Sequence, residues 1–149
     1  MSLSTERSRR PWHLWLVVVV ATLFMSVGLY DFVMVAAQDQ AYLTSRYTPE
    51  GVAYFSDYPW YLLALFGINV IGVMLALIVS LWSRRAAMRL ALVSAVADVV
   101  LLVITILFRD RFEAIGIGLT VQDIAICLGI VLLAWYFHRL SRRETLQGA

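Results

Sequence analysis

The stretch that decides the fold is Leu90–Phe108, LALVSAVADVVLLVITILF, an apolar run with one carboxylate, Asp98, near its centre. Arg89 and Arg109 bound the run. A helix rises about 1.5 Å per residue, so about 20 residues cross the roughly 30 Å of hydrocarbon in a bilayer. The run therefore predicts a transmembrane helix. An aspartate at its centre costs about 2.5–3.5 kcal/mol on insertion scales, so it needs a partner, a proton or water.

The composition is that of a membrane protein. The chain has 149 residues, of which 62% are hydrophobic and 15% charged, whereas soluble domains average about 45–50% apolar and 25% charged residues. The net charge is only +2, and the twelve basic residues, all arginine, sit at segment ends rather than on one face, which argues against nucleic-acid binding. The single cysteine, Cys127, excludes an intrachain disulfide and any paired-cysteine redox or zinc motif.

Three further apolar runs predict spans at about 12–37, 60–82 and 114–138. Together with 90–108 they predict an all-α integral membrane four-helix bundle, a single domain covering 1–149. The first run is too long for a signal-peptide core and lacks a small-x-small cleavage site, so we expect a retained helix. Residues 83–89 and 109–113 are predicted as turns, and 144–149 as a disordered tail.

The longest polar stretch, residues 38–59, is rich in aromatic residues. Within it, Thr48-Pro49-Glu50 is a helix-start signature, since it places a capping hydroxyl before a proline and an acid. Tyr54 and Tyr58 then fall on one face of the helix. We predict a short interfacial helix lying across the mouth of the bundle. An ordinary loop anchored by tyrosines is the alternative.

The arginines predict the topology, because cytoplasmic loops of membrane proteins carry an excess of basic residues. One side of the predicted bundle holds nine arginines and the other holds three. Both termini are therefore expected in the cytoplasm, with the aromatic loop 38–59 outside. The three outer arginines are Arg46, Arg109 and Arg111; the nine inner ones are Arg7, Arg9, Arg10, Arg84, Arg85, Arg89, Arg139, Arg142 and Arg143.

The polar residues of the spans group by depth. Asn69 is predicted at the depth of Asp98, while Asp31 and Asp123 fall in the outer half. No arginine is expected within a span, so these acids should be protonated, solvated or bound to a cation. We predict a polar funnel open to the outside and closed below by aliphatic side chains. Its candidate ligand- or cation-binding residues are Tyr30, Asp31, Asn69, Asp98, Gln122 and Asp123.

A structural role for the same residues is the alternative. Asp98 can hydrogen-bond Asn69 and thereby hold two helices together. Asp31 and Asp123 can be solvated acids at helix ends. The two histidines, His13 and His138, fall near the predicted cytoplasmic face, where interfacial hydrogen bonding is favoured over a metal or haem site. No catalytic motif is present, so neither enzyme activity nor a cofactor is expected.

Several short motifs carry a family resemblance, and they cover roughly residues 11–75. The chain resembles a family of small bacterial four-span membrane proteins, mostly uncharacterised and often labelled "sugar transporter". The resemblance implies a multi-pass protein of the bacterial inner membrane, with Asp31 as a motif residue. The motifs are Pro11-Trp12-His13-Leu14-Trp15, Gly28, Tyr30-Asp31, Tyr42-Leu43, Thr48-Pro49-Glu50, Tyr54-Phe55 and Pro59.

Two functions follow as hypotheses. The first is a transporter-like or solute-binding membrane protein that binds a small polar solute or cation in an outward-facing acidic cavity. Four short helices rarely enclose a complete transport path, so this protein is expected to act as a homo-oligomer. The second is an accessory subunit that docks onto a larger membrane protein complex and transports nothing itself.

Overall fold

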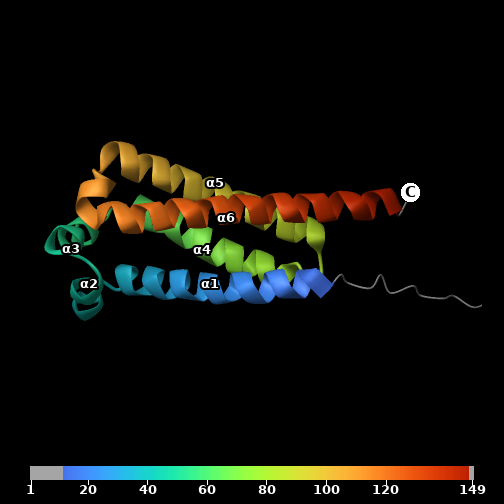
Figure 1. The fold of residues 1–149 in the computed structure, drawn as a ribbon, viewed down its shortest axis with the longest axis horizontal. Helices are drawn as coiled ribbons and strands as arrows, with labels where there is room; N and C mark the ends of the chain where they lie inside the picture. Colours follow the sequence, from blue (N-terminus) through green and yellow to red (C-terminus); the bar gives the residue numbers. More distant parts are fainter. Residues whose placement is uncertain (1–11, 148–149) are drawn as a thin grey trace, which may run out of the picture.

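The computed structural model describes residues 12–147, with side chains as far as residue 142, and this part of the chain consists of helices joined by short turns. Four helices are long and apolar enough to cross a membrane, and they lie side by side along the long axis (Figure 1). The predicted all-α, four-span architecture is confirmed. The helices are α1 (Trp12–Ala36), α2 (Gln40–Arg46), α3 (Pro49–Ser56), α4 (Trp60–Val79), α5 (Arg84–Phe108) and α6 (Arg111–Gln147).

The long helices run alternately up and down the bundle. The start of α1, the α4–α5 turn and the end of α6 lie at one end, while α2, α3 and the α5–α6 connection lie at the other (Figure 1). The expected inner and outer arginines of the described residues therefore lie at opposite ends of the bundle. Arg7, Arg9 and Arg10 lie outside the described residues. The orientation across the membrane stays a prediction.

Several predicted helix boundaries were wrong. Helix α5 begins at Arg84 rather than at 90, because Ser83 Oγ caps it by accepting a hydrogen bond from the backbone N–H of Ala86 at 3.3 Å. The predicted basic turn is therefore mostly helical. Helix α4 ends at Val79, and α6 continues to Gln147, so most of the tail predicted as disordered from residue 144 is helical.

The two short helices form the end of the bundle. The predicted helix α3 is confirmed, since Thr48 Oγ1 accepts from the backbone N–H of Gly51 at 3.3 Å and Pro49 occupies the first turn. Helix α2 was not predicted. Its cap is Asp39, whose side chain accepts from the backbone N–H of Tyr42 at 2.8 Å. An Asp-Gln start is an ordinary capping signal, but the polar composition of the loop obscured it.

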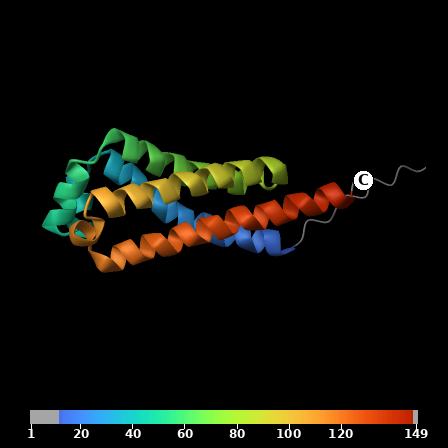
Figure 2. The ribbon, with the colours of Figure 1, turned by 90° about the horizontal axis from the view of Figure 1, so that it is seen from above.

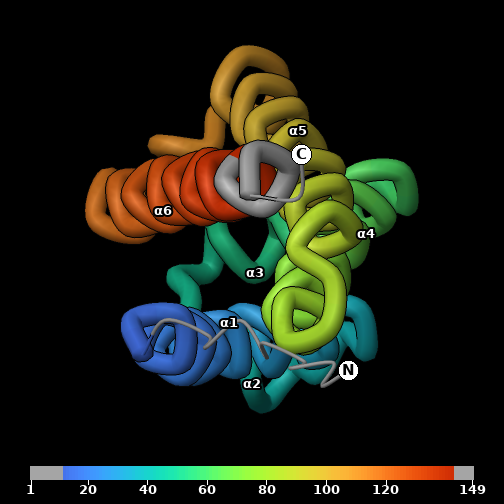
Figure 3. Tube along the Cα trace, turned by 90° about the vertical axis from the view of Figure 1, so that its right-hand side faces the viewer, coloured from blue at the N-terminus to red at the C-terminus, as the bar shows by residue number. Residues whose placement is uncertain are grey.

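The four spans do not pack equally. Helices α4, α5 and α6 form the closely packed part, whereas α1 rests mainly on α4. At the α4–α5 crossing a Cβ on Gly72 would lie 2.2 Å from Ser94 Oγ, so a larger residue there would require the Ser94 side chain to move. The end-on view shows α1 and α6 apart, with α3 lying across the space between them at the far end (Figure 3). Seen from above, α4, α5 and α6 follow one another, and α1 crosses behind them (Figure 2).

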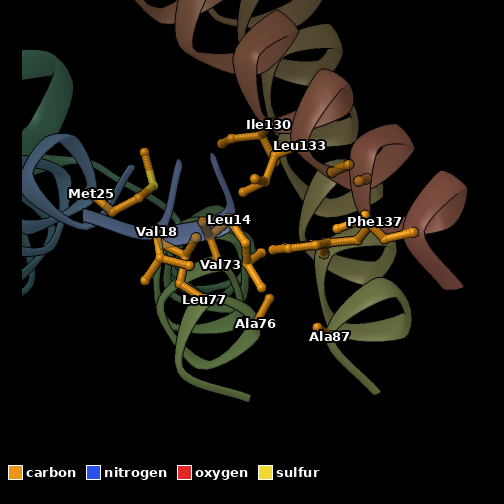
Figure 4. Packing of buried hydrophobic residues seen from close by; sticks show 14 residues of the cluster. Leu14, Val18, Met25, Val73, Ala76, Leu77, Ala87, Ile130, Leu133 and Phe137 are labelled. Atoms are coloured by element: carbon orange, nitrogen blue, oxygen red, sulfur yellow. The ribbon is translucent and has the colours of Figure 1, made fainter. Parts of the chain in front are cut away.

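The main hydrophobic core lies toward the α4–α5 turn. It draws side chains from all four spans, including Leu14 of α1, Val73 and Leu77 of α4, Ala87 of α5 and Phe137 of α6 (Figure 4). Leu14, Ala87 and Phe137 are fully buried. This end of the bundle is therefore closed by apolar packing, and the polar groups of the spans are left to the other end.

Helix α6 has a kink near its start. Gly116 has a φ of 85° and a ψ of 161° inside the helix, a conformation that is essentially restricted to glycine. Residues 111–115 consequently form a separate turn, set at an angle to the rest of α6 (Figure 1). Without the kink those residues would continue straight out of the bundle.

Gly116→Ala tests this conformational requirement. We expect the substitution to lower the free energy of unfolding by about 1–3 kcal/mol, because a Cβ is strained at this φ and ψ. The measurement is unfolding of the purified chain in mixed micelles. Gly118→Ala is the matched control, since its φ is not positive and a Cβ there meets nothing within 4 Å. Equal stability of the two variants would contradict the assignment.

Candidate functional site

A buried pair of polar side chains joins α4 and α5. Asn69 Nδ2 donates a hydrogen bond of 2.7 Å to Asp98 Oδ1, and the two residues are only 4% and 7% exposed. The Cys127 thiol of α6 faces the same carboxyl. The structure thus brings together the two residues that were predicted at one depth.

Asp31 lies near the end of α1, under the short helix α2. Its Oδ1 accepts hydrogen bonds from the hydroxyls of Tyr42 at 2.6 Å and Tyr47 at 3.0 Å. The Arg46 guanidinium adds a positive charge nearby. Asp31 is therefore held by α2 and the residue after it, rather than being a simply solvated acid at a helix end.

The two tyrosines are fixed as donors. Burial raises the pKa of the Tyr47 phenol, and the charge of Asp31 and the hydrogen bond to it raise that pKa further. The pKa of Tyr42 is raised by burial and then by the same carboxylate. Both hydroxyls therefore remain protonated at physiological pH, since each of these influences disfavours the phenolate.

Arg111 corrects the expectation that no arginine enters a span. It is 7% exposed, forms an ion pair with Asp123 on the same helix, and donates from Nη1 to Thr105 Oγ1 of α5 at 3.2 Å. Twelve residues separate the paired side chains, which is about 18 Å along a straight helix. The kink at Gly116 makes the pairing possible, because it turns residues 111–115 back toward the body of α6.

Sequence reasoning placed Arg111 in a solvated turn because mixed charges surround it. The signal that could have found its position is Gly116, five residues later, near the start of an otherwise regular helix. A glycine there marks a possible break. The direction of the break depends on tertiary packing, which the local sequence does not contain.

The polar residues line one cavity of about 280 Å³, together with apolar side chains such as Val70 and Leu101. Three polar atoms of its lining are buried and have no hydrogen-bond partner among the described groups: Asn69 Oδ1, Asp98 Oδ2 and Arg111 Nε. The thiol near Asp98 is only a weak donor. The residues that line the cavity thus carry two acceptors and one donor that have no hydrogen-bond partner among the described groups.

Helix α3 covers the cavity at the end of the bundle, and Phe55 of α3 belongs to the lining, as do the flanking residues Tyr47 and Tyr58. Two side chains fix this cover. Arg109 donates to the carbonyls of Tyr54 at 3.2 Å and Asp57 at 3.0 Å, and its guanidinium lies 4.8 Å from the centre of the Tyr54 ring. Gln38 donates to the Phe55 carbonyl at 2.9 Å.

Of the remaining candidate residues, two line the cavity and the others lie outside it. Gln122 and Asp123 line the cavity, whereas Tyr30 is 53% exposed and packs edge-on against the Tyr42 ring outside it. His13 contacts the Tyr136 hydroxyl at 2.7 Å, and His138 contacts Met88. Within residues 12–142, no three His, Cys, Asp or Glu side chains gather closely enough to hold a metal ion.

Arg111→Met tests the ion pair. Removing one partner of a fully buried pair costs about 3–5 kcal/mol, and because the Asp123 side chain is 35% exposed we expect a loss of about 1–3 kcal/mol. The double variant Arg111→Met/Asp123→Leu should recover more than half of it, since no lone charge remains. Unfolding in mixed micelles measures both. A double variant no more stable than Arg111→Met would argue against the pairing.

Comparisons with known proteins give no relative. No family model, no curated protein and no solved structure matches this chain. The resemblance to the small bacterial four-span family therefore stays a prediction, and the function has to be argued from the side chains of the cavity.

Proposed function

We propose that this chain is a membrane protein that binds a solute through a small polar group, held in the cavity between the four spans. The unpartnered atoms of Asn69, Asp98 and Arg111 carry the proposal. Each buried donor or acceptor left unsatisfied costs about 1–3 kcal/mol. Groups of this kind, gathered around a cavity under a fixed cover, are typical of a binding site with a few placed polar groups in a largely apolar wall.

The charges disfavour an anionic ligand, and the unpartnered atoms favour a ligand with hydroxyl groups. Arg111 is paired with Asp123, and Arg46 lies near Asp31, so neither cation is left to bind an anion. Asp98 adds a third carboxyl group, which disfavours an anionic ligand further. A hydroxyl donates one hydrogen bond and also accepts, so two hydroxyls on one ligand can satisfy the two acceptors and the one donor. The volume of about 280 Å³ suits a group smaller than a drug-sized ligand.

The proposal includes the topology expected from the arginines. Both termini lie in the cytoplasm of a bacterium, and α2 and α3 cover the cavity on the outer side of the inner membrane. The distribution of arginine between the two ends supports this orientation. Transport would further require a second copy of the chain, because four spans of this length do not enclose a complete path through the bilayer.

Cysteine labelling tests the orientation. Ser45→Cys, on the exposed surface of α2, should react with a membrane-impermeant thiol reagent in intact cells. Ser83→Cys, at the opposite end, should react only after lysis. Native Cys127 is buried and provides little background. The reverse pattern of labelling would overturn the proposed topology.

Asp98→Asn tests ligand binding with the least change of shape. The new amide can still accept the hydrogen bond from Asn69, but it presents an N–H donor where Asp98 Oδ2 offered an acceptor. We expect wild-type protein in nanodiscs to be stabilised by at least one compound in a panel running from monosaccharides to 1-O-alkyl glycerols, by mass action. Thermal unfolding followed by tryptophan fluorescence measures the shift, and Asp98→Asn should lose it.

Asp57→Asn is the control, because Asp57 is exposed and does not line the cavity. It should keep the full shift and report any general effect of removing a carboxylate. A panel without any stabilising compound, or an equal shift in Asp98→Asn and wild type, would contradict the proposed binding site.

A further inference from the structure

A second hollow opens beside the polar cavity. It is a groove of about 760 Å³ between α1 and α6, with Val73 of α4 at its floor. Its walls are almost wholly aliphatic and aromatic, with Leu16, Val20 and Phe24 on α1 and Ala125 and Leu133 on α6. The end-on view shows the two helices apart along this side of the bundle (Figure 3). In a membrane, this side faces lipid.

The groove and the cavity adjoin each other. Phe24, Met25, Gln122 and Ile126 line both of them. From these shared residues the groove runs away from α3, as far as Leu16 on α1 and Tyr136 on α6. The cavity therefore holds the unpartnered hydrogen-bonding atoms, and the groove offers only apolar contact. Because the groove opens between α1 and α6, it also gives a side passage to the bilayer.

This combination argues against the two simplest occupants. A hydrocarbon chain alone would leave the buried polar atoms of Asn69 and Arg111 unsatisfied. A polar solute alone has no apolar part that could occupy the groove. A molecule with a polar head and one apolar tail satisfies both regions at once, in a single orientation relative to the bundle.

The dimensions fit a single chain of moderate length. Between Leu16 and Met25, α1 rises about 14 Å. An extended peptide reaches about 3.6 Å per residue, which is three bonds, so an extended chain advances about 1.2 Å per bond. A hydrocarbon chain of about 12 carbons therefore fills this length. The charges described above disfavour a phosphate head, and the unpartnered atoms favour hydroxyl groups.

We propose that the ligand of the cavity is a neutral single-chain amphiphile, with a hydroxylated head among Asn69, Asp98 and Arg111 and its chain in the α1–α6 groove. It enters sideways from the bilayer, not through the cover formed by α3. This inference rests on the proposed function and adds the class of ligand and its route. The head points toward α3 and the chain away from it, as in a lipid of the leaflet on the α3 side.

Photo-labelling in phosphatidylcholine nanodiscs tests the proposal. The probe is a monoacylglycerol with a 12-carbon chain and a diazirine near the end of that chain. A phosphatidylcholine carrying the same photoreactive chain is the reference for ordinary lipid contact. We expect the monoacylglycerol probe to label groove residues of α1 and α6 at least tenfold more than the reference at equal mole fraction, as mapped by mass spectrometry.

Two glycines of α6 give a matched pair of variants. Both Gly118 and Gly129 are exposed, and a Cβ would meet nothing within 4 Å at either, but only Gly129 lines the groove. Gly129→Leu should reduce the labelling at least tenfold, and Gly118→Leu should leave it unchanged. Equal labelling by the two probes, or equal labelling of the two leucine variants, would overturn the inference.

The outcomes also separate this inference from the proposed function. If short polyols stabilise wild type and Gly129→Leu alike, and Asp98→Asn abolishes that effect, the polar site stands and the amphiphile is wrong. If Asp98→Asn changes neither stabilisation nor labelling, the polar site itself is wrong.

Discussion

A charge inside a bilayer has to be satisfied by the protein itself, and the ion pair between Arg111 and Asp123 is where that constraint shapes this fold most. The pair needs the kink at Gly116, because a straight helix would separate the two side chains. The same fold-back lets Arg111 contact Thr105 and so ties the start of α6 to α5. It also sets the base on which α3 packs, since α3 contacts α6.

The two ends of the bundle are held together in different ways. Toward the α4–α5 turn the spans share one apolar core with fully buried side chains. Toward α3 they separate around a cavity. There a smaller apolar cluster, which includes Val35, Leu43 and Phe55, joins the spans to α2 and α3. Side-chain hydrogen bonds from Tyr42 and Tyr47 to Asp31 add to this contact. The free-energy cost of the unpartnered polar atoms near α3 is offset by the apolar packing near the α4–α5 turn.

The length and hydropathy of each apolar run, and the depth of each residue along its helix axis, predicted the features that are determined within a single helix. They located the four spans and put Asn69 and Asp98 at one level, where the structure joins them. They could not locate Arg111, since its position depends on how a kinked turn packs against α5. They also could not show that Asp31 lies under α2, because that contact joins side chains of two helices across a turn.

The sparse packing of α1 bears on how the protein is made. Only four of its 25 residues are buried, and its main partner, α4, is synthesised after it. α1 must therefore enter the membrane as an independent helix, stable in lipid by its own hydrophobicity, before any tertiary contact exists. This corresponds to insertion first and helix association afterwards. Assembly then consists of α4, arriving with α5 and α6, docking onto a helix that is already in place.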